Sequence, residues 1–351
     1  MPEFCRHNRF VERCPICSKD LPGAGAGPGA ARRAGGAGAG AKDATAKRGA
    51  RSAAAGRARR PAGLRVYADG APRAREDGYS CELVPGLRSS EDARRLAAEL
   101  GFSGARLSTL ASSPPGSYGE ASALAQGGEI ERAILLCFLT AYLSPVEGDL
   151  SFATIQRAFA AVETGGIGSL DLDALPFGPR TSHRPGDGLR TLLAYESWSQ
   201  RAGSQAQTLA GDPAWSAERR FARAFERLSI PGLSRAARFE LLVSLGNLGL
   251  LELTADSLHL HAATSGSGGA ARGDASADPV LTAGKRIFGI GDALTLERRA
   301  AALADACATS IDALDLALFN WASPERATLG IPDEDSGDEL LEVEALTALG
   351  L

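Results

Sequence analysis

The sequence lacks a long apolar run: its longest strongly apolar stretch is the eleven residues from Ala133 to Leu143. A helix that crosses a membrane needs about 20 apolar residues, which excludes an integral membrane protein. The opening residues, Met1 to Cys5, also lack the apolar segment of a secretion signal. We therefore expect a cytoplasmic protein with no membrane partner.

Lysine is scarce as well, with 4 Lys beside 34 Arg among 351 residues. The many Ala, Gly and Arg residues indicate GC-rich coding, so the preference for Arg over Lys carries little functional information. Three of the six cysteines, Cys81, Cys137 and Cys307, are widely scattered, which fits buried thiols better than a disulfide framework. No P-loop, dinucleotide-binding glycine motif or Gly-x-Ser-x-Gly sequence is present.

Charge is distributed unevenly along the chain. Residues 1–63 hold 13 basic and 4 acidic residues, whereas residues 64–351 hold 25 and 38. The last twenty residues, Pro332 to Leu351, have seven acids and no base. A basic arm ahead of an acidic body favours an anionic partner for the arm. The alternative is a solvated tether whose arginines reflect coding bias.

The first twenty residues contain a metal-ligand pattern. Cys5 and His7 precede a Cys-x-x-Cys pair, Cys14 and Cys17, so four ligands lie within thirteen residues. This spacing predicts a zinc knuckle in which all four positions of one zinc ion are filled, as in structural sites. Metal binding would then supply the folding energy that so short a segment cannot obtain from a core. A redox Cys-x-x-Cys is the alternative, although no strand and helix flank it.

The rest of the chain divides by composition. Residues 21–63 contain 16 Ala, 11 Gly and 9 Lys or Arg, which predicts a disordered linker. Residues 64–331 have a globular composition in which helical periodicity dominates, and residues 332–351 read as a loose acidic tail. We therefore predict a mainly α protein: a zinc knuckle at 1–20, the linker, one helical domain at 64–331, and the tail.

Helical periodicity is found in the following segments. The expected helices are one opening at Ser90, followed by 129–143, 151–162, 189–201, 216–228, 236–248, 279–287, 293–307 and 311–321. Between them, residues 251–260 alternate between apolar and polar, which predicts one small β-hairpin. His259 and His261 alternate within it and are expected at its surface.

Two turns between helices resemble the helix-hairpin-helix pattern. The Pro231 turn runs from Leu228 to Arg238, and the Gly289 turn runs from Arg286 to Leu294. In such a turn, glycine permits positive φ and the N–H groups of the next helix face a phosphate. The predicted DNA contacts are Gly232, Ser234 and Arg235 in the first turn, and Lys285, Arg286, Gly289 and Gly291 in the second. The alternative is that both turns are structural only.

Two further patterns hold polar groups that could carry chemistry. Asp315 lies on the last strong helix among apolar neighbours, with Asp312 one turn earlier, and such a carboxylate needs neutralisation or a charged partner. An acid/base site and a capping or salt-bridged acid are both open interpretations. The loop from Pro176 to His183 places Arg180 and His183 on a turn-rich segment ahead of Arg201. These groups could grip a phosphorylated base, or the loop could be a connector.

Several stretches of the body resemble the alpha-glutamyl/putrescinyl thymine pyrophosphorylases of clade 3. They are residues 178–181, 220–228, 285–292 and 314–321. The resemblance covers about residues 79–330 and implies a helical domain similar to helix-hairpin-helix DNA glycosylases. It implies that an amine displaces pyrophosphate from a pyrophosphorylated hydroxymethyl-uracil in DNA. The chain lacks the Val-Asp-Thr-His surroundings of a glycosylase aspartate, which argues against cleavage of the glycosidic bond.

For this reaction, the candidate catalytic residues divide into two roles. Arg180 and Arg201 would stabilise the charge that develops on pyrophosphate. Asp315 would take the proton of the amine, with Asp312 or His183 as the other candidates. Two further interpretations remain: a non-catalytic, zinc-containing DNA-binding protein, and a helical protein-interaction domain.

Overall fold

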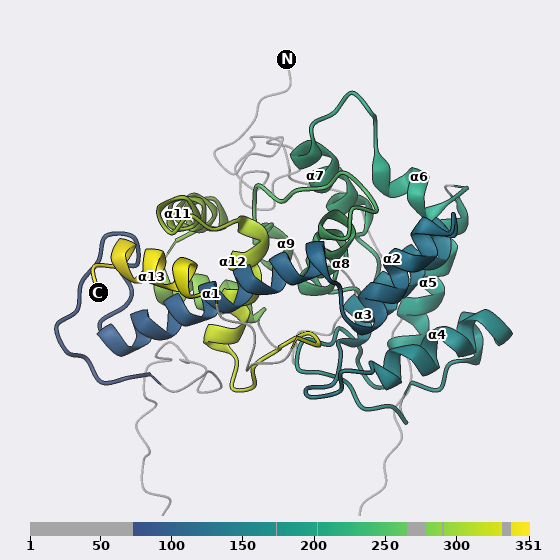
Figure 1. The fold of residues 1–351 in the computed structure, drawn as a ribbon, viewed down its shortest axis with the longest axis horizontal. Coiled ribbons are helices and arrows are strands. Elements are labelled where there is room, and N and C mark those ends of the chain that lie inside the picture. The colour runs from purple at the N-terminus through teal and green to yellow at the C-terminus, as the bar shows by residue number, and fades with distance from the viewer. Residues whose placement is uncertain (1–72, 173, 202, 265–277, 290, 332–337) are drawn as a thin grey trace, which may run out of the picture. The chain divides into compact units, whose positions relative to one another are not determined.

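The computed structural model describes residues 73–172, 174–201, 203–264, 278–289, 291–331 and 338–351. All of them belong to one compact unit, which spans Arg65–Leu351. Its helices are α1 (Ser90–Ser112), α2 (Gly116–Gln126), α3 (Ile130–Leu143), α4 (Ala153–Gly165), η3 (Ile167–Ser169), α5 (Gly188–Arg201), α6 (Gln205–Ala210), α7 (Ala217–Arg227), α8 (Arg235–Asn247), α9 (His261–Thr264), α10 (Pro279–Ile287), α11 (Ala293–Ala306), α12 (Ile311–Ala322) and α13 (Glu339–Ala348) (Figure 1). The predicted mainly α fold is confirmed.

Most of these helices begin where a short polar side chain can cap them. Ser216, Ser234 and Ser310 accept from the backbone N–H groups that open α7, α8 and α12. Asp278 caps α10 directly before Pro279, and Asp292 caps α11. Because the first N–H groups of a helix have no partner inside it, such caps fix where each helix starts.

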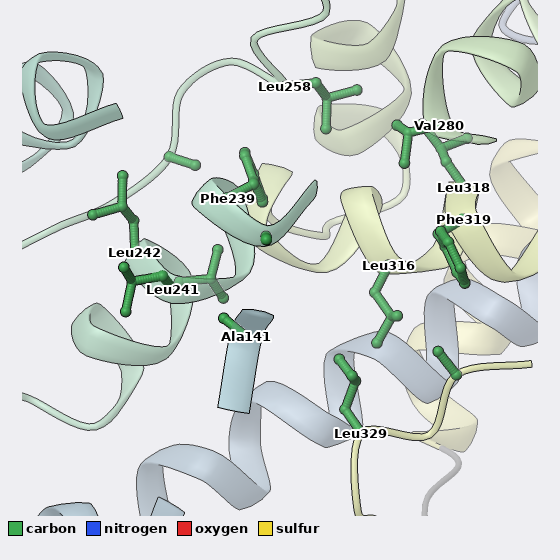
Figure 2. Close-up of a cluster of buried hydrophobic side chains, with 14 of the residues drawn as sticks. Ala141, Phe239, Leu241, Leu242, Leu258, Val280, Leu316, Leu318, Phe319 and Leu329 are labelled. Carbon is green, nitrogen blue, oxygen red and sulfur yellow. The ribbon is translucent and has the colours of Figure 1, made fainter. Parts of the chain in front are cut away.

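The core lies around two helices that are buried on nearly every face. All residues of α12 except Asp312 are buried, and so is α8 from Arg235 to Leu245. A helix that is buried all round must be covered by others, and here α1 and α10 pack on α12 while α3 packs on α8. Figure 2 shows side chains of α8, α10 and α12 in one apolar cluster, among them Phe239, Val280 and Phe319.

The end of the acidic tail is a helix rather than a loose segment. Helix α13 packs along α1, where Gly101 and Gly104 make room for it (Figure 1). A Cβ atom at Gly104 would lie 2.3 Å from Cδ2 of Leu341, so a larger residue there would require the Leu341 side chain to move. The prediction of a loose tail is therefore wrong for residues 338–351.

The predicted β-hairpin at residues 251–260 is also wrong, because this described segment contains no strand. Its alternation reflects burial, since Leu253, Leu258 and Leu260 all face the core. Its backbone N–H groups do not pair with another strand. Those of Leu258 and Leu260 donate to the carboxylate of Glu297 on α11. Side chains of neighbouring helices thus replace the strand pairing that the pattern predicts.

In the part of the chain that the structure covers, no helix is long and apolar enough to cross a membrane.

Candidate functional site: a buried arginine–aspartate cluster

Four charged side chains from distant parts of the sequence meet in the interior. Arg180, in the loop before α5, donates through Nη2 to Oδ2 of Asp315 on α12. Arg235, the first residue of α8, places Nη1 2.7 Å from Oδ1 of the same carboxylate. The Nε of Arg235 donates to Oδ2 of Asp278 over 2.8 Å. Arg180 and Asp315, which the sequence analysis assigns to one site, are therefore in direct contact.

Helix caps and ion pairs hold these groups in place together. Asp278 accepts from the N–H of Val280 at the start of α10, so one carboxylate serves both the helix and Arg235. Burial works against ionisation of Asp278, but the charge and hydrogen bond of Arg235 outweigh it and lower the pKa of this carboxyl. Arg235 also donates to the backbone carbonyl of Leu258 over 2.9 Å. Both groups are charged at neutral pH.

A third arginine, Arg238, lies one turn along α8 and is 3% exposed. Within the described ranges it forms no ion pair, and its guanidinium group lies 4.5 Å from the ring centroid of Phe225. Burial, and then the charge of Arg235, lowers its pKa to about 10, so it remains a cation at neutral pH. We call Arg180, Arg235, Arg238, Asp278, Asp312 and Asp315 the interior cluster.

Asp312 gives the interior cluster a group that titrates near neutrality. Burial raises the pKa of its carboxyl to about 7, and the negative charges of Asp315 and Glu240 act in the same direction. The N–H of Ala255 donates to its Oδ1 over 3.3 Å, which opposes this rise only in part. A carboxyl that is half protonated at neutral pH can accept or give a proton there. Asp315, in contrast, lies in ion pairs with Arg180 and Arg235.

His259 lies beside the cluster and is buried, contrary to the expectation of a surface position. Its ring stacks on Phe225 at 4.1 Å between centroids, and its backbone has φ 53°. Burial lowers its pKa to about 4, with the neighbouring His261 and the arginines adding to the effect. The imidazole is therefore neutral at pH 7. His261 is exposed, as expected.

A second group of buried charges lies further along α8. Glu240 accepts from Nη2 of Arg106 on α1 and, over 3.1 Å, from the hydroxyl of Ser244. The hydroxyl of Tyr118 lies 3.3 Å from Nη2 of Arg106 and 3.4 Å from Glu240. One carboxylate here faces one guanidinium group, so the charge is balanced.

The two other predicted catalytic residues do not join the interior cluster. Arg201 is exposed at the end of α5, and its Nε donates to the carbonyl of Ser197 in the same helix over 3.1 Å. His183 is buried, and its ring lies 4.7 Å from that of Phe177. Its backbone N–H donates to the hydroxyl of Thr181, so it helps to shape the loop that carries Arg180.

The Pro231 turn is fixed by groups of the protein itself. Gly232 has φ 82°, and a Cβ atom there would lie 1.9 Å from Oγ1 of Thr191 on α5. The N–H of Ser234 donates to Oγ of Ser182 over 2.9 Å, and the hydroxyl of Ser234 caps α8. Arg235 points inward, so of the three predicted DNA contacts only Gly232 and Ser234 are exposed.

The Gly289 turn also has partners within the chain. Gly289 has φ 79°, and Gly291 is partly buried against Thr295. Asp292 accepts from the N–H of Thr295 over 2.8 Å, and this bond lowers the pKa of its carboxyl. A carboxylate at the start of α11 occupies the place where a phosphate would bind. Lys285 is exposed and Arg286 is partly buried at the end of α10.

The predicted zinc ligands Cys5, His7, Cys14 and Cys17 lie outside the described residues. Within the described residues, no group of three or more His, Cys, Asp or Glu side chains could hold a metal ion.

Nothing in the sequence pattern assigns Asp278, Arg238 or His259 to a catalytic site. Asp278 before Pro279 predicts a helix cap and gives no sign of its second role. The burial of Arg238 could have been predicted from the sequence. It lies in a helix where apolar residues, among them Phe239, Leu241 and Leu242, occupy several faces. Such a helix is buried, and so are its charged residues.

Comparisons with protein-family models, with curated proteins and with solved structures found no match to this chain.

Proposed function

We propose that this protein modifies a base in DNA, exchanging a pyrophosphate group on hydroxymethyl-uracil for an amine. The observation that carries the proposal is the interior cluster, where three buried arginines lie with two aspartates, Asp278 and Asp315, beside an acid with a pKa of about 7, Asp312. While Asp312 is protonated, the cluster has one more arginine than carboxylates, which suits an anion, and an acid that titrates near neutrality suits proton transfer. The resemblance of the sequence to thymine pyrophosphorylases points to the same chemistry.

Unused hydrogen-bond donors support an anionic ligand. Within the described ranges, Arg180 has two buried guanidinium nitrogens, Nε and Nη1, with no hydrogen-bond partner. Nη2 of Arg235 and Nε of Arg238 are likewise buried without a hydrogen-bond partner in these ranges. Buried donors without acceptors cost free energy, and they are rare in folded proteins. The oxygens of pyrophosphate would accept these bonds in the bidentate geometry that guanidinium groups favour.

The proposed reaction is a nucleophilic substitution in which an amine replaces pyrophosphate. The amine nitrogen forms a bond to the exocyclic methylene carbon of the base, and the bond from that carbon to the pyrophosphate oxygen breaks. Pyrophosphate leaves with the electron pair, and the arginines stabilise its charge. The amine loses a proton, which Asp312 accepts in its ionised form. Asp315 holds Arg180 and Arg235 in position and does not need to exchange a proton.

DNA would approach over a surface that has exposed basic groups near the Pro231 turn. Helix α7 leads into this turn and exposes Arg219, Arg223 and Arg227. Contacts between arginines and phosphates release counterions, so the affinity for DNA would fall as the salt concentration rises. In a plot of log K against log salt concentration, each phosphate contact would add about −0.9 to the slope.

The test is turnover of an oligonucleotide that carries a pyrophosphorylated hydroxymethyl-uracil, with an amine as co-substrate. We expect the mass of the amine adduct and one released pyrophosphate per adduct. Asp312→Asn should abolish turnover and leave DNA affinity within about twofold, because it removes only a proton acceptor. Asp305→Asn, at an exposed position of α11, is the control and should keep full activity.

The other outcomes separate the remaining interpretations. Salt-dependent DNA binding by the wild-type protein without turnover of any amine tested would support a DNA-binding protein that is not an enzyme. No DNA affinity at low salt would contradict both and favour a protein-interaction domain. Full turnover by Asp312→Asn would refute the assigned base.

A structural zinc ion at Cys5, His7, Cys14 and Cys17 is part of the same proposal and rests on their spacing. Elemental analysis should find one zinc per chain, and Cys14→Ser should remove it. Protein purified without chelator that contains no metal would contradict this assignment.

A further inference from the structure

A small pocket lies apart from the interior cluster, at the start of α1. Its volume is about 70 Å³, and it is bounded by the segment before α1 and by the ends of α10 and α12. Its lining includes Arg73, Ala74, Glu76, Arg88, Asp92, Arg286 and Trp321. None of the residues of the interior cluster lines it.

Three arginines and two carboxylates line this pocket, so positive charge exceeds negative charge by one. The arginines are Arg73, Arg88 and Arg286; the carboxylates are the exposed Glu76 and the buried Asp92, which lies 3.2 Å from Nη2 of Arg95. Burial, and then the charge of Arg73, lowers the pKa of Arg286, and the charge of Asp92 opposes this shift in part. An anion in the pocket would relieve this repulsion between arginines.

The backbone holds Arg286 firmly beside the pocket. The N–H of Gly86 donates to the carbonyl of Ile287 over 2.8 Å, and a Cβ atom at Gly86 would lie 2.1 Å from the carbonyl oxygen of Arg286. The guanidinium group of Arg286 lies 4.6 Å from the ring centroid of Trp321. This arrangement fixes a cation before any ligand binds, which lowers the entropic cost of binding.

We propose that this pocket binds a single phosphate group. A cavity of about 10–15 Å³ on the same measure holds one water, so 70 Å³ has room for a phosphate group. Trp321 is 1% exposed and offers no surface on which a base could stack. The site goes beyond the proposed reaction and does not depend on it. The phosphate comes either from free inorganic phosphate or from a DNA strand.

The test is titration calorimetry and thermal unfolding of the full chain with inorganic phosphate at constant ionic strength. Wild type should bind phosphate, and its midpoint of unfolding should rise with phosphate concentration. Arg286→Gln should weaken the affinity about tenfold or more, since it removes a charge-assisted hydrogen bond. Ala74→Glu should have the same effect by placing a carboxylate in the pocket while Arg286 remains.

The control is Arg157→Gln, which removes an exposed arginine of α4 and should leave the affinity unchanged. Arg286→Gln should weaken the affinity equally in an Arg238→Met background, in which the interior cluster has lost one of the groups proposed to bind an anion. Stabilisation that persists in Arg286→Gln and disappears in Arg238→Met would overturn the proposal, as would equal losses in Arg286→Gln and Arg157→Gln. A wild-type protein that does not bind phosphate would overturn it as well.

A DNA oligonucleotide distinguishes the two sources of the phosphate group. If the pocket binds a phosphate of a DNA strand, the oligonucleotide should displace inorganic phosphate from wild type. Arg286→Gln should then reduce the slope of log K against log salt concentration for DNA binding by about 0.9, the value of one phosphate contact. If the pocket binds free phosphate, the oligonucleotide and inorganic phosphate should bind at the same time. Either result supports a phosphate site provided that Arg286→Gln removes it.

Discussion

Helix α8 carries buried charged residues at two places, and the numbers of cations and carboxylates are equal at only one of them. Near its middle, Glu240 faces one cation, Arg106, and two hydroxyl groups lie close to this pair. The arrangement is an ion pair of one cation with one carboxylate that joins α1 to α8. Within the described residues, Nε of Arg106 has no hydrogen-bond partner, so the two places differ in charge and not in the presence of unused donors.

At the start of α8 the balance is different. Arg180, Arg235 and Arg238 lie with the carboxylates of Asp278 and Asp315, and the third acid of the cluster, Asp312, is half protonated at neutral pH. An unpaired buried cation costs free energy that packing alone does not return. Stability alone therefore does not explain the excess of arginines at the start of α8, whereas the anionic ligand that we propose would.

The largest effect is expected for Asp315→Asn. It leaves two arginines in the interior without their shared carboxylate, and loss of one partner of a buried pair costs about 3–5 kcal/mol. Urea denaturation should show at least this loss, or no folded protein at all. Asp305→Asn, at an exposed position, should change the free energy of unfolding by no more than about 0.5 kcal/mol. A loss below about 1 kcal/mol for Asp315→Asn would show that the cluster is hydrated.

The next largest change in the free energy of unfolding distinguishes the Glu240–Arg106 pair from the interior cluster. Glu240→Gln alone should cost about 3–5 kcal/mol, because Arg106 is then buried without a counter-charge. Adding Arg106→Met should restore most of the stability, since apolar replacement of both partners is often neutral. Adding Arg180→Met to Asp315→Asn should restore much less, because Arg235 and Arg238 remain. Equal recovery of stability in the two double variants would contradict the claim that the ion pair and the interior cluster differ in charge.

A smaller effect concerns pH. The carboxyl of Asp312 has its pKa raised from 3.8 to about 7, so its contribution to stability is complete below pH 4 and is lost as the pH rises towards 7. His259 has its pKa lowered from 6.5 to about 4, so its contribution is complete above pH 6.5 and is lost as the pH falls towards 4. The two dependences oppose one another between pH 4 and 6.5.

Single variants should expose each dependence. Asp312→Asn should make stability rise with pH in this window, and His259→Asn should make it fall, by up to about 1.4 kcal/mol per pH unit. Asparagine suits position 259 because it tolerates the positive φ there. Thermal unfolding from pH 4 to 7 measures both slopes, and identical curves for the two variants would contradict the assigned pKa shifts.

The sequence predicts most of the helices because local signals set their ends. The expected 279–287 coincides with α10, and several other helices differ from their predicted bounds by one or two residues. Ser, Asp and Pro at the starts supply the caps and the backbone geometry. Helix α13 is missed because its acidic composition suggests solvation. Gly101 and Gly104, which make its docking possible, signal close packing only once a partner is known.

The site is predictable in part. Asp315 among apolar neighbours requires a partner, and the partner is Arg180, which the sequence also selects. The sequence does not show that Arg235 turns inward, because the start of a helix after an exposed turn gives no indication of direction. Nor does it show that residues 251–260 lie against α11 and α12, since alternation of apolar residues reports burial and not strand pairing.

The most direct test of the account is binding of pyrophosphate to the interior cluster. Titration calorimetry in an Arg286→Gln background leaves the pocket at α1 out of the measurement. We expect binding that Arg238→Met weakens at least tenfold, although the same substitution keeps or raises the free energy of unfolding because it removes an unpaired buried cation. Pyrophosphate that binds equally well with and without Arg238, or a clear loss of stability in Arg238→Met, would contradict the claim that the surplus charge at the start of α8 serves an anionic ligand.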